Sequence, residues 1–210
     1  KGVAVRPYEK DPAAIYAQSF ATVRKEARLE RFGAGMEKMA TRLIHACGMT
    51  DIVSDLAFSN GAAEAGVAAL ARGCVVYCDV EMVRTGIIAR NMPVGVSLAC
   101  TLNDPRAAAH GKTLQTTRSA AAVEFWEELE GSICVIGNAP TALFRLLERI
   151  DEGAGKPALI IGIPVGFVGA VESKAELASN PRSCPFITVH GRRGGSAMAS
   201  SVLNALAGLV

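Results

Sequence analysis

The chain has 210 residues, of which half are hydrophobic and only 5% aromatic, and its net charge is +2. That length suits one large domain with a substantial buried core. The small charge and the lack of basic clusters argue against a nucleic-acid partner, and no apolar run reaches the roughly 18 residues that a membrane span needs.

The first third of the chain is predicted to be helical. Asp11-Pro12 is a typical helix start, with an N-cap residue followed by proline in the first turn. A second helix is expected at 35–47 and ends at Gly48. A third helix follows Ser59-Asn60 and stops at Gly73, since glycine is the residue that most often ends a helix.

From about residue 73 onward, short apolar runs alternate with helical segments. The runs, which we predict as strands, lie at 74–78, 96–100, 132–136, 158–163 and 186–189. The clearest helical segments lie at 117–130, 139–151, 171–179 and 195–208. Strands that are apolar throughout indicate a mostly parallel sheet covered on both faces. We therefore expect a single three-layer α/β/α, doubly wound domain, with its core at about 73–210 and a helical extension at about 1–72, and with ligands bound beyond the strands' carboxyl ends.

The six cysteines form no CxxC pair. Because the N-terminus lacks the pattern of a signal peptide, we expect a cytoplasmic protein whose thiols are reduced. Neither the cysteines nor the three histidines have metal-ligand spacing, so no metal is expected. No Walker A or GxGxxG loop is present either, which gives a nucleotide cofactor little support.

One histidine, His45, lies on the predicted helix 35–47 but away from its apolar stripe. At about 100° per residue, His45 points away from Met39 and Leu43 and lies on the same side as Arg42. It also lies in the last turn, where the helix dipole favours an imidazolium that could exchange a proton near neutral pH. An ordinary surface histidine near a helix end fits the same position, and geometry alone leaves both interpretations open.

Several turns after predicted strands carry groups that suit an anion. The segment 190–196 (HGRRGGS) combines glycines and two arginines with the start of the last helix, where free N–H groups face outward. The segment 116–119 (TTRS) is typical of a capped helix start that presents Arg118, and 137–141 (GNAPT) starts another helix with proline. Asp79 directly follows the strand at 74–78, where it could be a site residue or, equally well, a helix N-cap. Simpler interpretations also stay open: a tight turn with two solvated arginines at 190–196, a surface arginine in the first helical turn at 118, and a helix start without a site at 137–141.

The chain has 15 arginines and 7 lysines. Guanidinium groups form bidentate bonds with carboxylates and phosphates, so this bias fits a polyanionic small ligand. A GC-rich genome would produce the same bias. Taken on their own, the residues therefore indicate an α/β enzyme or a binding protein for an anionic ligand.

Six segments of the chain resemble the precorrin-8X methylmutase family. They occur in the family's order, span nearly the whole chain, and lie at 11–20, 41–48, 116–122, 136–148, 162–174 and 191–198. Two stretches, IGNAPTALFRLLE and PVGFVGAVESK, are long and chemically unusual. Together these segments carry the resemblance.

The resemblance implies an isomerase of cobalamin biosynthesis that moves a methyl group from ring carbon 11 to ring carbon 12 of precorrin-8X, a tetrapyrrole, and so forms hydrogenobyrinic acid. The matching histidine, His45, would protonate the macrocycle, and no cofactor would be needed. Ser19, Arg42 and Arg118 match substrate contacts of the family, and Arg192 matches through the general pattern of its loop. The resemblance further implies a homodimer with the pocket near the subunit interface, where the segment bearing Ser19 could reach a neighbour's site.

Two other functions stay open at this point. A cobalt-precorrin-8 methylmutase of the oxygen-independent pathway shares the fold and the histidine but acts on a ring that already holds cobalt. The segments IHACG and GRRGGSAM are more similar to the oxygen-dependent branch. A non-catalytic corrinoid carrier would bind the same pigments, but without a spectral change on turnover.

Overall fold

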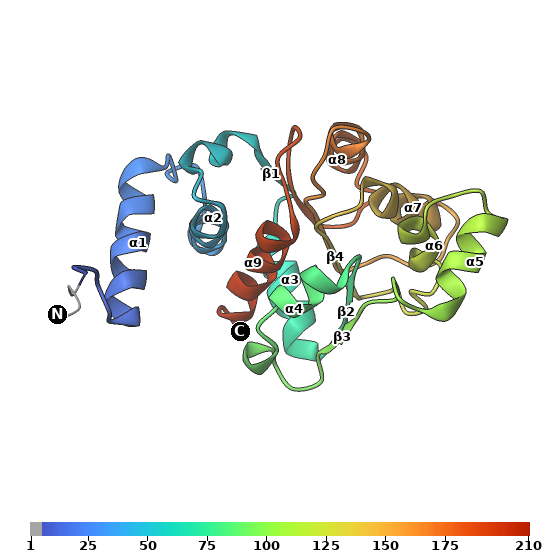
Figure 1. The fold of residues 1–210 in the computed structure, drawn as a ribbon, viewed down its shortest axis with the longest axis horizontal. Helices are drawn as coiled ribbons and strands as arrows, with labels where there is room; N and C mark the ends of the chain where they lie inside the picture. The colour runs from blue at the N-terminus through green and yellow to red at the C-terminus, as the bar shows by residue number, and fades with distance from the viewer. Residues whose placement is uncertain (1–5) are drawn as a thin grey trace, which may run out of the picture.

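A six-stranded sheet crosses the middle of the molecule in the computed structural model, which describes residues 6–210 (Figure 1). Its strands are β1 (Leu56–Phe58), β2 (Val75–Cys78), β3 (Ser97–Ala99), β4 (Ile133–Ile136), β5 (Leu159–Gly162) and β6 (Phe186–Val189). They are arranged in the order β1-β6-β5-β4-β2-β3. All neighbouring pairs are parallel except β1 and β6, in which Leu56 lies opposite Val189.

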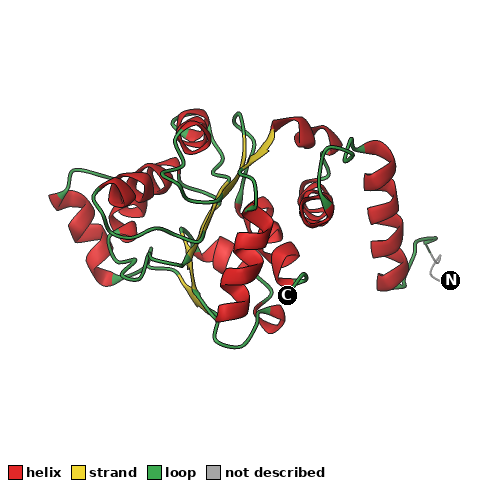
Figure 2. Ribbon diagram, turned by 180° about the vertical axis from the view of Figure 1, so that it is seen from behind, coloured by secondary structure: helices red, strands yellow, loops and turns green. Residues whose placement is uncertain are grey.

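Helices cover both faces of this sheet. The helices of the described chain are α1 (Pro12–Glu26), α2 (Ala34–Cys47), α3 (Ala62–Arg72), α4 (Glu81–Gly86), α5 (Pro105–Thr113), α6 (Arg118–Val123), α7 (Pro140–Asp151), α8 (Ala170–Ser179) and α9 (Ser196–Ala207), with the 3-10 helices η1 (Thr50–Asp55) and η2 (Ala89–Asn91). Figure 2 shows α3, α4 and α9 on one side of the sheet and α5 to α8 on the other. The expected three-layer, doubly wound α/β/α architecture is therefore confirmed.

The central strands are buried on both faces because their apolar side chains pack into one of two hydrophobic cores. Every residue of β4, β5 and β6 is buried. Side chains alternate between the faces of a strand, so Ile133 and Val135 pack with α9 and its neighbours, while Cys134 and Ile136 pack with α7 on the other face. This explains the apolar runs that the sequence shows.

Helices α1 and α2 form the N-terminal extension and stack outward from α9 (Figure 1). The Asp11 side chain caps α1 by accepting a hydrogen bond from the Ala13 N–H. Gly48 ends α2 in the left-handed conformation, with φ +70°. Only Val23 of α1 is buried, so α1 lies on the outside of the molecule. Within residues 6–210, no helix is long and apolar enough to cross a membrane.

The structure differs from the sequence-based prediction in two segments. The first 72 residues were expected to hold only helices, yet β1 pairs with the sheet edge at Leu56–Phe58; a strand of three residues is too short to show a periodic pattern. The helix expected at 117–130 ends at Val123. Beyond it, Trp126 stacks on Tyr77 with ring centres 5.2 Å apart, so tertiary packing determines the path of the chain there.

Candidate functional site

Ser19 and His45 meet where α1 packs against α2. The Ser19 Oγ lies 2.7 Å from the His45 Nδ1, and both residues are half-buried. A hydroxyl both donates and accepts, so it pairs with either form of the ring. It donates to Nδ1 of a neutral imidazole and accepts from the Nδ1–H of an imidazolium. It also accepts from the Nδ1–H of the neutral ring that remains when an imidazolium gives up its Nε2 proton, so the ring is held in place before and after that transfer.

Two aromatic rings of α1 enclose this histidine. The ring centre of Tyr16 lies 5.4 Å from that of His45, and the Phe20 ring meets it edge-on at 5.3 Å. The Arg42 guanidinium lies 5.9 Å from the centre of the Phe20 ring. Tyr16, Ser19 and Phe20 have the i, i+3, i+4 spacing of one helix face. The facing helix α2 contributes Arg42 and His45 from the side opposite its buried stripe.

The sequence alone did not assign Tyr16 and Phe20 to the site. The available indication was the spacing of Tyr16, Ser19 and Phe20, which puts a hydroxyl between two aromatic rings on one face. That spacing becomes informative only when α1 is known to pack against α2.

A groove of about 300 Å³ runs beside this cluster, between α1, α2 and the end of α9. Phe20 and Arg42 line it, so it adjoins the His45 cluster. Arg24 and Lys38 add positive charge to its walls, and Glu37 adds one negative charge. The groove therefore suits a ligand that carries carboxylates. Its volume is at the low end of the range for small-molecule pockets, about 300–1,000 Å³.

Asp79, at the carboxyl end of β2, anchors the turn that follows β4. Its carboxylate accepts hydrogen bonds from the N–H groups of Gly137, Asn138 and Ala139 at 3.0, 2.9 and 2.8 Å. Burial raises the pKa of the Asp79 carboxyl, and the three hydrogen bonds oppose that shift. The N-cap of the following helix, α4, is Val80, so Asp79 does not act as that cap. Its observed role is to fix a neighbouring turn.

The same turn leads to Arg118 through a pair of threonines. Thr117 caps α6 by accepting a hydrogen bond from the Ala120 N–H, and its Oγ1 lies 2.8 Å from the Thr141 Oγ1. Arg118 is the first residue of α6 and is exposed. Helix α6 lies on the opposite side of the sheet from α2 (Figure 1). Arg118 therefore does not join Ser19, Arg42 and His45 within one chain.

The loop after β6 carries two adjacent arginines in different surroundings. The Arg192 guanidinium lies 5.4 Å from the ring centre of Phe167, whose side chain is 85% exposed. Arg193 instead forms ion pairs with Asp51 and Asp55 at 2.8 and 2.6 Å. Only Arg192 presents an exposed cation here without an ion pair to any part of the chain that the structure describes.

The structure brings three of the five predicted site residues together, namely Ser19, Arg42 and His45. Arg118, at the start of α6, and Arg192, in the loop after β6, lie at the carboxyl edge of the sheet, where α/β proteins commonly bind ligands. Across residues 6–210, no group of three or more His, Cys, Asp or Glu side chains could hold a metal ion. The cluster around His45 can thus supply one proton at Nε2 beside a cationic groove.

Comparison with known proteins gives a consistent result. Residues 14–209 match the sequence profile of a family described as precorrin-8X methylmutase. A Pseudomonas aeruginosa protein named precorrin-8X methylmutase is 57% identical over 201 residues, which cover 95% of this chain and 97% of that protein. A Salmonella typhimurium protein named cobalt-precorrin-8 methylmutase is 38% identical over 207 residues, with 95% and 96% covered. The solved structure of the Thermus thermophilus precorrin-8X methyl mutase superposes with a TM-score of 0.84 at 36% identity, covering 94% of this chain and 95% of that one.

Proposed function

Because the chain belongs to the precorrin-8X methylmutase family, we propose that it moves a methyl group from ring carbon 11 to ring carbon 12 of precorrin-8X and forms hydrogenobyrinic acid. The enzyme is an isomerase. The observation that carries the mechanism is the pair of Ser19 and His45, enclosed by two aromatic rings at the side of a cationic groove.

In this mechanism His45 is the acid that protonates the macrocycle. With the Ser19 hydroxyl at Nδ1, the Nε2 atom is the one that gives its proton to the substrate and later takes one back. The methyl group stays within the substrate, so product and substrate contain the same atoms. No nucleophile, oxidant or methyl donor is consumed. The protein's task is to place the acid and to fix the ring's conformation.

Arginines would hold the substrate by its peripheral acetate and propionate carboxylates. Arg42 lies nearest to the acid, and we assign it a carboxylate that is close to the migrating methyl group. Arg118 and Arg192 are exposed and would bind carboxylates farther away on the ring. Charge-assisted hydrogen bonds of this kind contribute about 1.5–3 kcal/mol each.

A homodimer would complete the pocket. The groove beside His45 is small for a tetrapyrrole with its side chains, and Arg118 lies on the other side of the same chain's sheet. Helix α1 is largely exposed. Three large apolar side chains in this region are also exposed, Ile15 and Tyr16 on α1 and Tyr8 just before it. A second copy packed on this region would bury them. Since Ser19 already pairs with His45 of its own chain, α1 does not need to cross to a neighbour to supply that hydroxyl.

We further propose that the natural substrate is the metal-free ring. The support is the higher identity to the precorrin-8X methylmutase of Pseudomonas aeruginosa than to the cobalt-precorrin-8 methylmutase of Salmonella typhimurium. A cobalt ion in the ring would be part of the substrate, and His45 would have the same role. The two substrates therefore have to be compared directly.

One experiment tests both the proposed reaction and the choice of substrate. The protein is mixed in excess with metal-free precorrin-8X or with its cobalt form, and the absorbance spectrum is followed over a single turnover. We expect conversion of the metal-free substrate to hydrogenobyrinic acid, at a rate above that for the cobalt form. If both pigments bind tightly but neither spectrum then changes to that of a product, the protein is a carrier and the proposed reaction is contradicted.

A further inference from the structure

Lys174 is a buried charged residue that the proposed mechanism does not use. It lies on α8, its exposed fraction is 0%, and its Nζ donates a hydrogen bond of 2.7 Å to the Arg193 carbonyl oxygen. Burial lowers the pKa of Lys174 to about 8, and the nearby Asp55 carboxylate partly opposes the shift. Burying an ammonium group is unfavourable unless it is well paired. The hydrogen bond from Lys174 to the Arg193 carbonyl, the one that its Nζ makes within residues 6–210, therefore indicates a role for this contact.

The residue that Lys174 holds is itself fixed from the other side. The Arg193 guanidinium pairs with Asp51 and Asp55 of η1, the 3-10 helix that follows the α2 segment carrying His45. The His190 N–H also donates to the Asp55 carbonyl oxygen at 2.8 Å. Thus the loop after β6 is attached to η1 by side-chain and backbone contacts.

A third set of contacts fixes the loop against the turn after β5. The Gly166 N–H donates to the Arg192 carbonyl oxygen at 3.2 Å, and the Gly195 N–H donates to the Ile163 carbonyl oxygen at 3.0 Å. Gly194 packs directly on the backbone carbonyls of 163 and 164, so a Cβ atom has no room there. The backbone on each side of Arg192 is therefore constrained, while the Arg192 side chain itself is exposed.

We propose that Lys174 and Arg193 are positioning residues whose task is to hold Arg192 as a carboxylate-binding group at a fixed place relative to the end of α2 and thus to His45. The inference rests on the proposed function, because it gives Arg192 a substrate carboxylate. The Arg193 guanidinium already binds two carboxylates of the chain, so it does not serve as the anion-binding group. The two neighbouring arginines therefore have separate roles.

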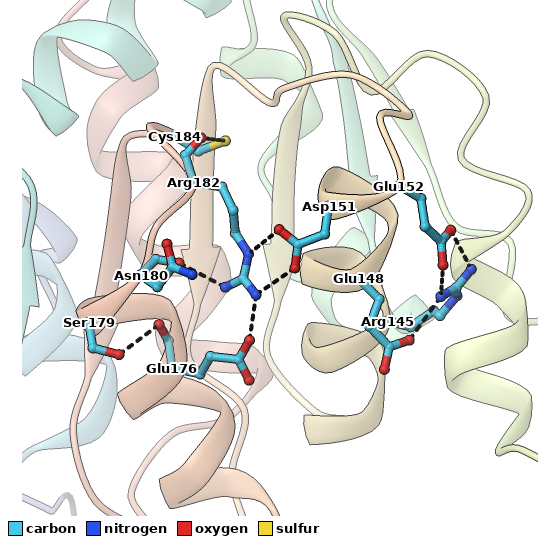
Figure 3. A network of polar contacts seen from close by, with 9 residues as sticks. All are labelled: Arg145, Glu148, Asp151, Glu152, Glu176, Ser179, Asn180, Arg182 and Cys184. Carbon is cyan, nitrogen blue, oxygen red and sulfur yellow. Dashed lines mark hydrogen bonds and ion pairs between the residues drawn. The ribbon is translucent and has the colours of Figure 1, made fainter.

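Arg182 provides a matched control (Figure 3). Its guanidinium also joins two carboxylates, Asp151 at 2.8 Å and Glu176 at 2.6 Å. Arg182 precedes β6, whereas Arg193 follows it, so the two arginines lie at opposite ends of that strand. Substituting Arg182 thus removes the same kind of ion pair at the edge of the sheet away from the proposed ligand loops.

The test compares Arg192→Ala, Arg193→Gln, Lys174→Met and Arg182→Gln in the full chain. Each variant is titrated with hydrogenobyrinic acid, followed by absorbance, and thermal unfolding confirms that it is folded. We expect Arg192→Ala to raise Kd about tenfold or more. Arg193→Gln and Lys174→Met should raise Kd by a similar factor, with kcat at saturating substrate retained, and Arg182→Gln should leave Kd unchanged.

The double variant Arg192→Ala/Arg193→Gln separates positioning from a general loss of structure. If Arg193 acts through Arg192, the double variant binds no more weakly than Arg192→Ala alone. Independent, additive losses would overturn the inference. Arg193→Lys keeps a cation beside Asp51 and Asp55 and should recover part of the affinity, and it carries the test if Arg193→Gln does not fold.

The remaining outcomes distinguish the inference from the proposed function. If Arg192→Ala weakens binding while Arg193→Gln and Lys174→Met bind normally, the positioning role is wrong and the carboxylate contact stands. If Arg192→Ala binds normally, the substrate contact and the positioning role both fail. In that case turnover of precorrin-8X by the wild-type protein still tests the reaction.

Discussion

Among single residues, His45 has the most specific expected effect. His45→Ala should lower the single-turnover rate of methyl migration by at least about 100-fold, the usual contribution of a general acid, and should still bind hydrogenobyrinic acid. His110→Ala is the control, since His110 also lies beside an aromatic ring, with centres 5.6 Å apart from Phe125, but on α5. Normal turnover by His45→Ala would refute the assignment of the acid. Loss of binding as well would give the ring a structural role.

Arg42 should affect binding before it affects chemistry. Removing its guanidinium in Arg42→Ala deletes a charge-assisted contact worth about 1.5–3 kcal/mol, so Kd for hydrogenobyrinic acid should rise by roughly one to two decades, with the rate of the bound substrate retained. Arg106→Ala is a matched control, because Arg106 also lies over a phenylalanine ring, that of Phe125 at 4.3 Å. An equal loss of affinity in both variants would contradict the specific role of Arg42.

Lys174 should make the free energy of unfolding depend on pH. Its pKa in the folded protein is about 8, below the value of 10.5 for an unperturbed lysine. Between these values the unfolded chain binds more protons than the folded chain, so the contribution of Lys174 to the free energy of unfolding rises with pH. In urea unfolding, the free energy of unfolding of the wild type minus that of Lys174→Met should therefore rise from pH 8 to pH 10. A constant difference would contradict this.

At the scale of elements, Asp79 joins β2 to the start of α7. In Asp79→Asn, one carboxylate oxygen becomes an NH₂ group that faces a backbone N–H, so a buried hydrogen bond is lost. We expect the free energy of unfolding to fall by about 1–3 kcal/mol, measured by urea denaturation. Asp151→Asn, at an exposed ion pair with Arg182, should cost less than about 1 kcal/mol. Equal losses in the two variants would mean that the buried hydrogen bonds to Asp79 stabilise the protein no more than an exposed ion pair does.

Elements with a strong local pattern were predictable, and those defined by distant contacts were not. The strand at 132–136 and the helix at 35–47 follow from burial on both faces and from a clear apolar stripe, and both are present. The short α6 ends where Trp126 turns to stack on Tyr77, a residue 49 positions earlier in the sequence. No local pattern contains that contact.

The candidate site shows the same division. The orientation of His45 away from the apolar stripe could be derived from helical spacing, but its contact with Ser19 depends on how α1 crosses α2. The resemblance to a family grouped Arg118 and Arg192 with His45. It could not show that Arg118 lies beyond the sheet from His45 within one chain. That separation is a property of the whole topology.

For the molecule as a whole, the separation of Arg118 from His45 leads to a prediction about assembly. If a second copy completes the pocket, light scattering at micromolar concentration should give twice the chain mass of 21.9 kDa. Mixing His45→Ala with Arg118→Ala should then restore some turnover, because a mixed dimer contains one site with both residues intact. A monomer, or mixtures with no more activity than their parts, would count against the shared pocket.

In the proposed mechanism, the hydroxyl of Ser19 has a consequence for the catalytic cycle. A carboxylate in its place would favour the imidazolium, and a backbone N–H would favour the neutral ring, so either would make one half of the cycle harder than the other. The Ser19 hydroxyl accepts from the Nδ1–H both in the imidazolium and in the neutral ring that remains after Nε2 has given up its proton, so the same hydrogen bond lasts through the cycle. Once the proton is returned, the enzyme is back in its starting state and is ready for the next substrate without a separate regeneration step.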